Sequence, residues 1–180
     1  MPGLKWIEPT AHRDQRGFFL ESYSRDRYAA AGIAHTFIQD NHSLSVRVGV
    51  IRGLHYQLEP QAQTKLVRVT AGAVYDVVVD LRQGSPTFGQ WEGFELSADN
   101  MRQLLVPRGF AHGFCTLVAN TEVQYKVDAL YSAAHDRGIA WNDPAIGIVW
   151  PACGREPILS DKDARHPVLA RAQLNFVYEG

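Results

Sequence analysis

The sequence predicts an all-β protein, a sandwich or a barrel, with one or two short helices. Turn-forming residues recur at short intervals, and the runs between them are rich in valine, leucine and aromatic residues. Two of these runs also alternate between apolar and polar residues, as a half-buried strand does. A chain of 180 residues with 46% hydrophobic content can bury one substantial core. We therefore expect a single domain over residues 1–180.

The expected strands follow one another along most of the chain. One short helix is expected at 25–31, where Ser24 could cap the start and Gly32 the end. A second helical turn is expected at 97–100, and the tail after Pro151 should consist of loops with one strand at most. Strands are expected at 18–23, 35–40, 50–57, 65–70, 73–82, 90–96, 101–106, 113–118 and 122–128.

Alternation within two strands predicts which side chains share a face, because successive residues of a strand point to opposite sides. In 73–82 the odd positions form an apolar face, whereas the even positions include Asp76 and Asp80 and suit the lining of a wet cavity. In 122–128 the apolar positions place Tyr125 inward. The simplest interpretation of Tyr125 is a core tyrosine whose hydroxyl reaches a backbone carbonyl.

Composition excludes several classes of protein. The formal net charge is -1 and the sequence pI is about 6.6, and no run of lysine and arginine offers a surface for nucleic acid or an anionic membrane. The first residues lack the basic and then apolar build of a signal peptide, so we expect a cytoplasmic protein that does not enter a membrane. Cys115 and Cys153 lack metal-ligand spacing, and free thiols are expected.

The clearest chemical signal is a cluster of cationic and ionisable residues on strand-like sequence. Arg52 and Lys65 suit a phosphate or a developing oxyanion, and His55 between them can carry protons near neutral pH. Taken alone, His55 is more simply interpreted as a hydrogen-bonded structural histidine, and Arg52 and Lys65 as charges at a solvated sheet edge. Strict alternation places Arg52 and His55 on opposite faces, so a shared cavity requires a bulge or twist near Gly53. The cluster favours a small enzyme.

Several longer motifs with characteristic residues follow one another over nearly the whole chain. One of them, Val106-Pro107-Arg108-Gly109-Phe110-Ala111-His112-Gly113-Phe114, has glycines that allow a tight turn and deliver His112 into a pocket. Motifs of six or more residues rarely agree by chance. The others are the segments 14–19 (Asp-Gln-Arg-Gly-Phe-Phe), 39–43 (Gln-Asp-Asn-His-Ser), 52–57 (Arg-Gly-Leu-His-Tyr-Gln), 85–89 (Ser-Pro-Thr-Phe-Gly), 141–144 (Trp-Asn-Asp-Pro) and 159–163 (Leu-Ser-Asp-Lys-Asp).

In this order, the motifs resemble those of the dTDP-4-dehydrorhamnose 3,5-epimerase family. The resemblance implies a cupin-type double-stranded β-helix, or jelly roll, that forms a homodimer and needs neither metal nor cofactor. It implies conversion of dTDP-4-dehydro-6-deoxy-D-glucose to dTDP-4-dehydro-L-rhamnose. By matching motif, His55 would be the base, Asp163 its carboxylate partner and Tyr125 the proton donor. Lys65, helped by His112, would stabilise the enolate oxygen. The sequence shows no glycine fingerprint for a dinucleotide.

The resemblance also implies contacts to the nucleotide sugar. Arg16 and Arg52 would bind the diphosphate, because arginine presents a planar fork to phosphate oxygens. Phe18 would stack on thymine, although a buried strand residue is the simpler interpretation of this position. Asp136 stands where the family commonly has glutamate, and the shorter acid leaves that contact open. The remaining substrate-binding candidates are Glu21, Gln39, Asp40, Asn41, Tyr131 and Lys162.

Three alternatives stay open at this point. A metal-dependent cupin oxygenase or isomerase could draw its ligands from His55, His112, Asp76 and Asp163, although no closely spaced His-x-His pair is present. A binding module without catalysis would have lost the base or the donor, and both are retained. An epimerase that acts only at C3 or only at C5 could use similar residues.

Overall fold

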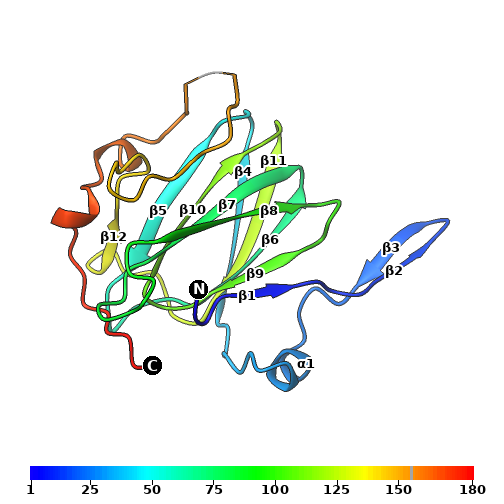
Figure 1. Cartoon of the computed structure of the whole chain (residues 1–180). Coiled ribbons are helices and arrows are strands. Elements are labelled where there is room, and N and C mark those ends of the chain that lie inside the picture. The colour runs from blue at the N-terminus through cyan, green and yellow to red at the C-terminus, as the bar shows by residue number, and fades with distance from the viewer. Residues whose placement is uncertain (155) are drawn as a thin grey trace.

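The computed structural model describes residues 1–154 and 156–180, and two five-stranded antiparallel sheets dominate it (Figure 1). Between residues 39 and 127 the chain passes from one sheet to the other at every connection except that between β7 and β8, which gives a jelly roll. One sheet has the order β1 (Lys5–Ile7), β9 (Gln103–Val106), β6 (Lys65–Ala71), β11 (Thr121–Val127), β4 (Gln39–Ser45). The other has the order β12 (Asp136–Gly138), β5 (Ile51–Gln57), β10 (Phe110–Thr116), β7 (Ala73–Asp80), β8 (Trp91–Ser97).

The two faces of β7 serve two different cores. Its even positions Val74 and Val78 pack between the sheets, against residues of β6, β9 and β11. Its odd positions Val77 and Val79 pack outside the second sheet, against the segment from 139 to the C-terminus. Asp76 is buried among the even positions. The predicted apolar face is therefore confirmed, and the predicted mixed face is the interior of the sandwich.

The outer face of the first sheet is covered at one end by α1 (Arg25–Ala30). Tyr28 and Ile33 pack there against Leu66 and Leu105. Ser24 occupies the N-cap position but makes no side-chain cap hydrogen bond, so its predicted capping role is wrong.

Gly32 ends this helix as predicted. It follows the C-cap residue Ala31 and has a φ of 77°, in the left-handed region where glycine carries no steric penalty.

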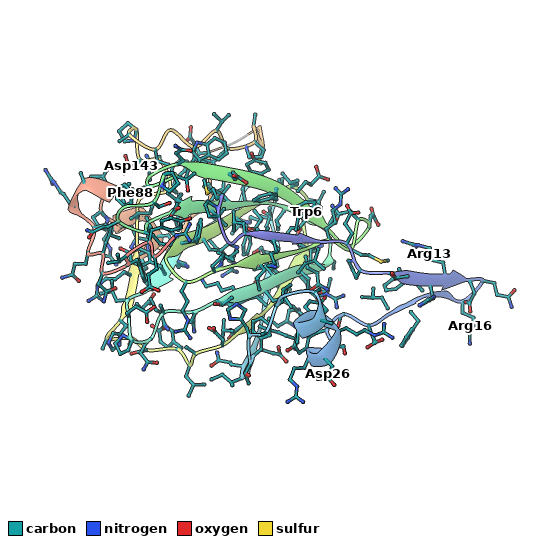
Figure 2. All side chains as sticks on the ribbon, turned by 60° about the horizontal axis from the view of Figure 1, so that its bottom comes forward. Trp6, Arg13, Arg16, Asp26, Phe88 and Asp143 are labelled. Atoms are coloured by element: carbon teal, nitrogen blue, oxygen red, sulfur yellow. The ribbon has the colours of Figure 1, made fainter. Side chains whose placement is uncertain are left out.

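A two-stranded hairpin projects from the body. It consists of β2 (Ala11–Asp14) and β3 (Gly17–Leu20), which pair only with each other among the described strands. Figure 1 shows it extending well beyond the two sheets, and Figure 2 shows Arg13 and Arg16 on it, with Arg16 near its tip. The strand predicted at 18–23 is the second arm of this hairpin.

Most expected strands are present, with shifted ends. The strand expected at 35–40 instead begins at Gln39 and runs to Ser45, and β1, β2 and β12 were not expected. Residues 97–100 form a turn rather than a helical turn, because the side chains of Ser97 and Asn100 bond each other's backbone N–H groups. The tail contains two 3₁₀ turns, η1 (Asp163–Arg165) and η2 (Leu169–Arg171).

Among residues 1–154 and 156–180, no helix has the length and apolar character needed to cross a membrane.

Candidate active site

A hollow of about 180 Å³, open to solvent, lies between the two sheets near the start of β6 and the end of β5. Both sheets contribute to its wall: His55 comes from β5, whereas Lys65 and Tyr125 come from β6 and β11. The three side chains on which the predicted chemistry depends therefore share one cavity. Its remaining lining residues are Tyr56, Gln57, Gln63, Tyr131, Asp136 and Lys162.

A bulge in β5 brings Arg52 to the same side of the sheet as His55. His55 stands opposite His112 and Arg52 opposite Phe114, so three steps along β5 match two along β10. Gly53 has a φ of 133°, and a Cβ atom there would lie 2.6 Å from Cα of Gly113. The bulge predicted at Gly53 is confirmed, and only glycine suits this close approach of two backbones.

His55 is held from behind by Asp163. Nε2 of His55 lies 2.6 Å from Oδ1 of Asp163, which is 5% exposed. The N–H of Asp163 donates to Oγ of Ser160, which fixes the start of the 3₁₀ turn that carries the carboxylate. Nδ1 of His55 has no hydrogen-bond partner in the described part of the chain. An imidazole that donates from Nε2 to the carboxylate leaves the lone pair of Nδ1 free to accept a proton.

The pKa values of His55 and Asp163 are both lowered, which suits the role of His55 as a base. Burial lowers the pKa of His55, opposed by the hydrogen bond to Asp163, and the charges of Lys65 and Lys162 lower it further. Burial would raise the pKa of Asp163, but contacts with His166 and His55 outweigh burial and hold that pKa well below its usual range. At neutral pH the pair is thus a neutral imidazole beside an ionised carboxylate.

Lys65 supplies a positive charge whose environment is unusual for lysine. Burial lowers its pKa to about 8, opposed by the charges of Asp76 and Asp136. Nζ of Lys65 lies 3.5 Å from the backbone carbonyl of His55, so the ammonium is adjacent to the base. His112, the other predicted enolate contact, is buried behind the hollow rather than in its wall, and its Nε2 lies 2.9 Å from both oxygens of Asp76.

Tyr125 faces the hollow from β11, on the inward side that the alternation predicted. Burial raises the pKa of Tyr125; the charge of Arg52 lowers it and that of Asp136 raises it further. The phenol is therefore protonated at neutral pH and can act as a donor. Arg52 is itself anchored, because Nε donates to Oγ of Ser45 and Nη2 to the carbonyl of Leu44.

Asp136 closes one side of the hollow together with two other predicted contacts. Its Oδ2 forms an ion pair with Nζ of Lys162 and accepts a hydrogen bond of 3.1 Å from the hydroxyl of Tyr131. Tyr131 is 61% exposed, so this side of the hollow meets solvent. One oxygen of the shorter acid at position 136 is therefore engaged within the chain.

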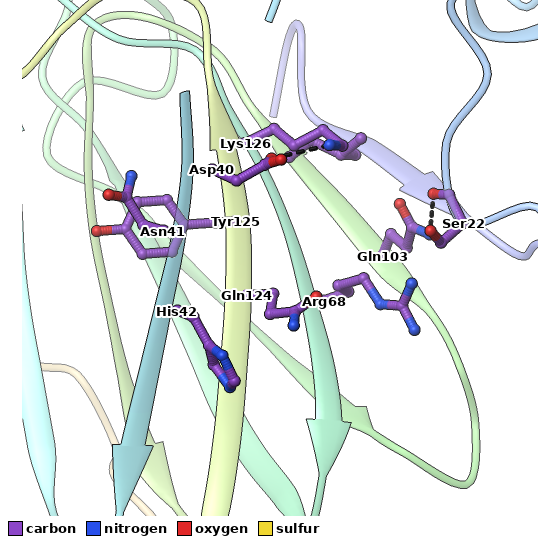
Figure 3. A pocket seen from close by; sticks show the side chains of 10 residues that line it. Ser22, Asp40, Asn41, His42, Arg68, Gln103, Gln124, Tyr125 and Lys126 are labelled. Carbon is purple, nitrogen blue, oxygen red and sulfur yellow. Dashed lines mark hydrogen bonds and ion pairs between the residues drawn. The ribbon is translucent and has the colours of Figure 1, made fainter. Parts of the chain in front are cut away.

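The predicted contacts on β4 divide between the two faces of the sheet. Gln39 and Asn41 lie on the side of Tyr125, which pairs with Asn41, and Nε2 of Gln39 donates to Oδ1 of Asn41 at 2.8 Å. Asp40 lies on the other side, where it accepts a hydrogen bond of 2.8 Å from Lys126. Figure 3 shows a second pocket, on the outer face of the first sheet, which Asp40 lines; the Tyr125 ring points away from the side chains of Gln124 and Arg68 there. Asp40 therefore does not face the candidate site, because neighbouring strand residues point in opposite directions.

Three further predicted contacts are not brought to the hollow. Glu21 forms an ion pair of 2.8 Å with Arg27 near α1. Arg16 is paired with Asp14 at the tip of the projecting hairpin, and Phe18 lies 55% exposed on the same hairpin. Neither Arg16 nor Phe18 is among the described residues that line the hollow.

His166 was not identified from the sequence. Its Nε2 lies 3.5 Å from Oδ1 of Asp163, and its ring stands edge-on to that of His55 at 5.5 Å between centroids. Residues three apart on a helical turn share a face, so the spacing of His166 from Asp163 could have indicated that the two side chains meet.

Donor atoms of His55, Asp163 and His166 all lie within 4.8 Å of one another, a grouping that could hold a metal ion. The metal-ligand set expected from the sequence also included His112 and Asp76. These two residues do not join the grouping, because they form a separate buried pair.

Residues 1–171 match the family model described as dTDP-4-dehydrorhamnose 3,5-epimerase. The chain belongs to this family. A relative of that name from Sinorhizobium fredii is 52% identical over 97% of this chain and 89% of its own length. The family prediction is confirmed.

Solved structures show the same fold. One from Bacillus anthracis, described as dTDP-4-dehydrorhamnose 3,5-epimerase with TDP and PPi bound, is 58% identical, covers 92% of this chain and 94% of its own, and has a TM-score of 0.90. One from Legionella pneumophila, in complex with dTDP-4-keto-L-rhamnose, is 47% identical, covers 98% and 94%, and has a TM-score of 0.93. The cupin-type jelly roll predicted from the family resemblance is confirmed.

Proposed function

We propose that this family member epimerises dTDP-4-dehydro-6-deoxy-D-glucose at C3 and C5 to give dTDP-4-dehydro-L-rhamnose. The observation that supports this most directly is the hollow shared by His55, Tyr125 and Lys65. The imidazole, which is hydrogen-bonded to a carboxylate, and the phenol come from opposite sheets, and the ammonium lies beside the imidazole. The pyranose lies between the sheets in this proposal. The family and its named relatives support this substrate, and the geometry of the hollow supports the roles that the family motifs imply for the residues.

The reaction begins when Nδ1 of His55 removes a proton from a carbon next to the C4 ketone. The ketone acidifies this hydrogen, because the negative charge left by the proton moves onto oxygen. Asp163 holds Nε2–H and stabilises the imidazolium that forms. The imidazole is neutral before this step, since burial lowers the pKa of His55. Positioned proton transfer of this kind contributes about a hundredfold to ten-thousandfold in rate.

The enolate oxygen needs a fixed positive charge, and Lys65 supplies it. An ammonium in a partly desolvated cavity stabilises a developing anion more strongly than in water, by about 3 kcal/mol for a well-placed donor. Asp76 and Asp136 favour the charged form of Lys65 against burial. His112 does not line the hollow, and it acts on Lys65 only indirectly, through its contact with Asp76.

Tyr125 completes the inversion by returning a proton to the opposite side of the ring. His55 and Tyr125 belong to different sheets, so they approach a sugar in the hollow from different directions. A proton removed on one side and returned on the other inverts the centre. The imidazolium then loses its proton and the phenolate regains one, which restores both groups before the second centre reacts. Each step moves only protons, so the reaction requires no redox cofactor.

The diphosphate and base require contacts that one chain does not assemble. Lys162 lines the hollow and the charge of Arg52 acts on Tyr125, but Arg16 and Phe18 lie on the projecting hairpin. We assign these two residues to the nucleotide site of a second copy in a homodimer. The exposure of Phe18 and of Phe19, 55% and 68%, supports this, because apolar rings on a projecting arm are stabilised by a protein surface that covers them.

The two thiols are compatible with a reducing cytoplasm. Cys115 and Cys153 are both free, with their Sγ atoms 3.9 Å apart.

Deuterium exchange tests the reaction and its two centres together. The purified protein and the 4-keto sugar nucleotide in deuterated water should give exchange at C3 and at C5 by proton NMR. Exchange at neither position would reject the function, and exchange at one would identify a single-centre epimerase. The variant His55→Asn should abolish exchange while nucleotide binding stays measurable by calorimetry. Undiminished turnover of that variant would remove His55 from the role of base.

The metal-dependent alternative is tested by dialysis against a chelator. The proposed mechanism predicts unchanged turnover after dialysis. Loss of activity that returns only with a stoichiometric metal ion would favour the alternative.

A further inference from the structure

We propose that His55, Asp163 and His166 form a binding site for a divalent transition-metal ion, best suited to Zn²⁺, and that the bound ion reversibly inhibits the enzyme. The inhibition, though not the binding, rests on the proposed role of His55 as the base. Two imidazoles and one carboxylate are a common zinc donor set that leaves an open coordination position.

The donor atoms already converge. Nε2 of His55 lies 2.6 Å and Nε2 of His166 3.5 Å from Oδ1 of Asp163, and all three atoms lie within 4.8 Å of one another. Tetrahedral zinc, with bonds of about 2.1 Å, holds neighbouring donors about 3.4 Å apart. The His166 contact already has this length. The His55 contact must open by about 1 Å, which small rotations of side chains can supply.

His166 is poorly explained as a structural histidine. Its side chain is 10% exposed, and Nε2 is a buried nitrogen without a good hydrogen-bond partner among the described residues. Its contact with Asp163 at 3.5 Å lowers the pKa of that carboxyl but is not a good hydrogen bond, and a buried nitrogen without one costs about 1–3 kcal/mol. A metal ion would satisfy this nitrogen.

Gly138 makes room for the His166 ring. It lies in β12 opposite His55, and a Cβ atom on it would stand 2.4 Å from Nε2 of His166. The two imidazoles can therefore approach the carboxylate together only because this strand position lacks a side chain.

The ion would inhibit by fixing the wrong tautomer of His55. In the active state Nε2–H donates a hydrogen bond to Asp163, and the lone pair of Nδ1 takes the proton of the substrate. A metal bound at Nε2 occupies that lone pair, so the neutral ring must carry its proton on Nδ1. The ring then has no free lone pair toward the sugar. The cation also removes Asp163 from its role of stabilising the imidazolium.

Two measurements on the whole protein test the site. Co²⁺ serves as the spectroscopic probe and should give the visible absorption of a low-coordinate nitrogen and oxygen site. Zn²⁺ should displace this band, suppress epimerisation and release the enzyme again on addition of EDTA. The variant His166→Gln should weaken both Co²⁺ binding and Zn²⁺ inhibition by at least about tenfold, measured on the activity that this variant retains.

A second variant and a control keep the test decisive. His55→Asn should also lose the Co²⁺ band, and its binding is read without any activity. The variant His42→Asn removes an exposed histidine that pairs with Glu122, and should leave the band and the inhibition unchanged. The site is rejected if Co²⁺ gives no band in the native protein, or if Zn²⁺ inhibits the folded His166→Gln variant at the same concentration. A band with no loss of activity would retain the site and overturn the inhibition.

Discussion

His55 and Asp163 are 108 positions apart in the chain, yet their side chains meet at 2.6 Å just behind the wall of the hollow. β5 supplies the imidazole, and a 3₁₀ turn in the C-terminal tail supplies the carboxylate. The tail therefore does more than cover the outer face of the second sheet, since it also completes the site. This relationship leads to the first prediction.

Replacement of Asp163 by Asn should keep the shape of the site and remove its negative charge. The amide cannot stabilise the imidazolium and can donate to Nε2, which places the ring proton on Nδ1. We expect kcat to fall by about a hundredfold or more, while the affinity for the nucleotide changes little. Steady-state kinetics and calorimetry check the two expectations. Asp161→Asn is the matched control, because Asp161 is an exposed neighbour, and equal losses in both variants would contradict the assignment.

Replacement of Tyr125 by Phe should separate proton removal from inversion. His55 can still take the proton, but without the phenol it returns a solvent proton to the same side of the ring. Deuterium should then appear at C3 or C5 of the substrate without formation of the L-sugar. NMR of the recovered substrate distinguishes the outcomes. Inverted product at the native rate would show that another group is the donor.

Local pattern was sufficient to predict the part of the site that lies on regular strands. Alternation in 122–128 placed Tyr125 inward, and the glycine at 53 indicated the bulge that turns Arg52 to the side of His55. β4 was placed too early, because Gln39–Ser45 is mostly polar and its strand conformation depends on pairing with β11. The three-residue strands β1 and β12 likewise depend on their partners.

The residues of the site that lie on the tail could not be derived from local pattern. Asp163 and His166 reach His55 because segments far apart in sequence pack together, and only the family motif indicated Asp163. The projecting hairpin explains why Arg16 and Phe18 stand apart from the other candidates in one chain.

The activity should decline as pH rises above about 8, because burial lowers the pKa of Lys65 to about that value. Loss of the ammonium leaves the enolate without its counter-charge. The profile of kcat against pH measures this effect. Lys65→Met should lower kcat at every pH and abolish this alkaline limb, and persistence of the limb would assign it to another group.

The stability should move in the opposite direction over the same range. The pKa of Lys65 is lowered from 10.5 in the folded state, so between pH about 8 and about 10.5 the unfolded chain binds the proton that the folded chain has lost. The contribution of this residue to the free energy of unfolding therefore rises with pH, by at most about 3 kcal/mol. Denaturant unfolding of the native protein and of Lys65→Met at both ends of the window isolates the difference.

Replacement of Gly53 by Ala should destabilise the protein and disrupt the site. The new methyl would stand 2.6 Å from Cα of Gly113 at a φ of 133°, so the β5 and β10 backbones must separate. We expect a loss of about 3 kcal/mol in the free energy of unfolding and a large loss of kcat. Gly84→Ala is the control, since φ is 82° there and nothing lies within 4 Å of the new atom. A cost of about 1 kcal/mol is expected for the control, and equal costs would contradict the role of the close approach.

Substitution of Phe18 and Phe19 by Ser should weaken self-association and substrate binding together. If the hairpin covers the nucleotide site of a second copy, the native protein should be a dimer by light scattering, and the double variant should shift toward the monomer. KM should rise more than kcat falls, because His55, Lys65 and Tyr125 remain in place in each chain. Leu130→Ser is the control, since Leu130 is 57% exposed and lies outside the hairpin. A native monomer with full activity would contradict the assignment of Arg16 and Phe18 to a partner's site.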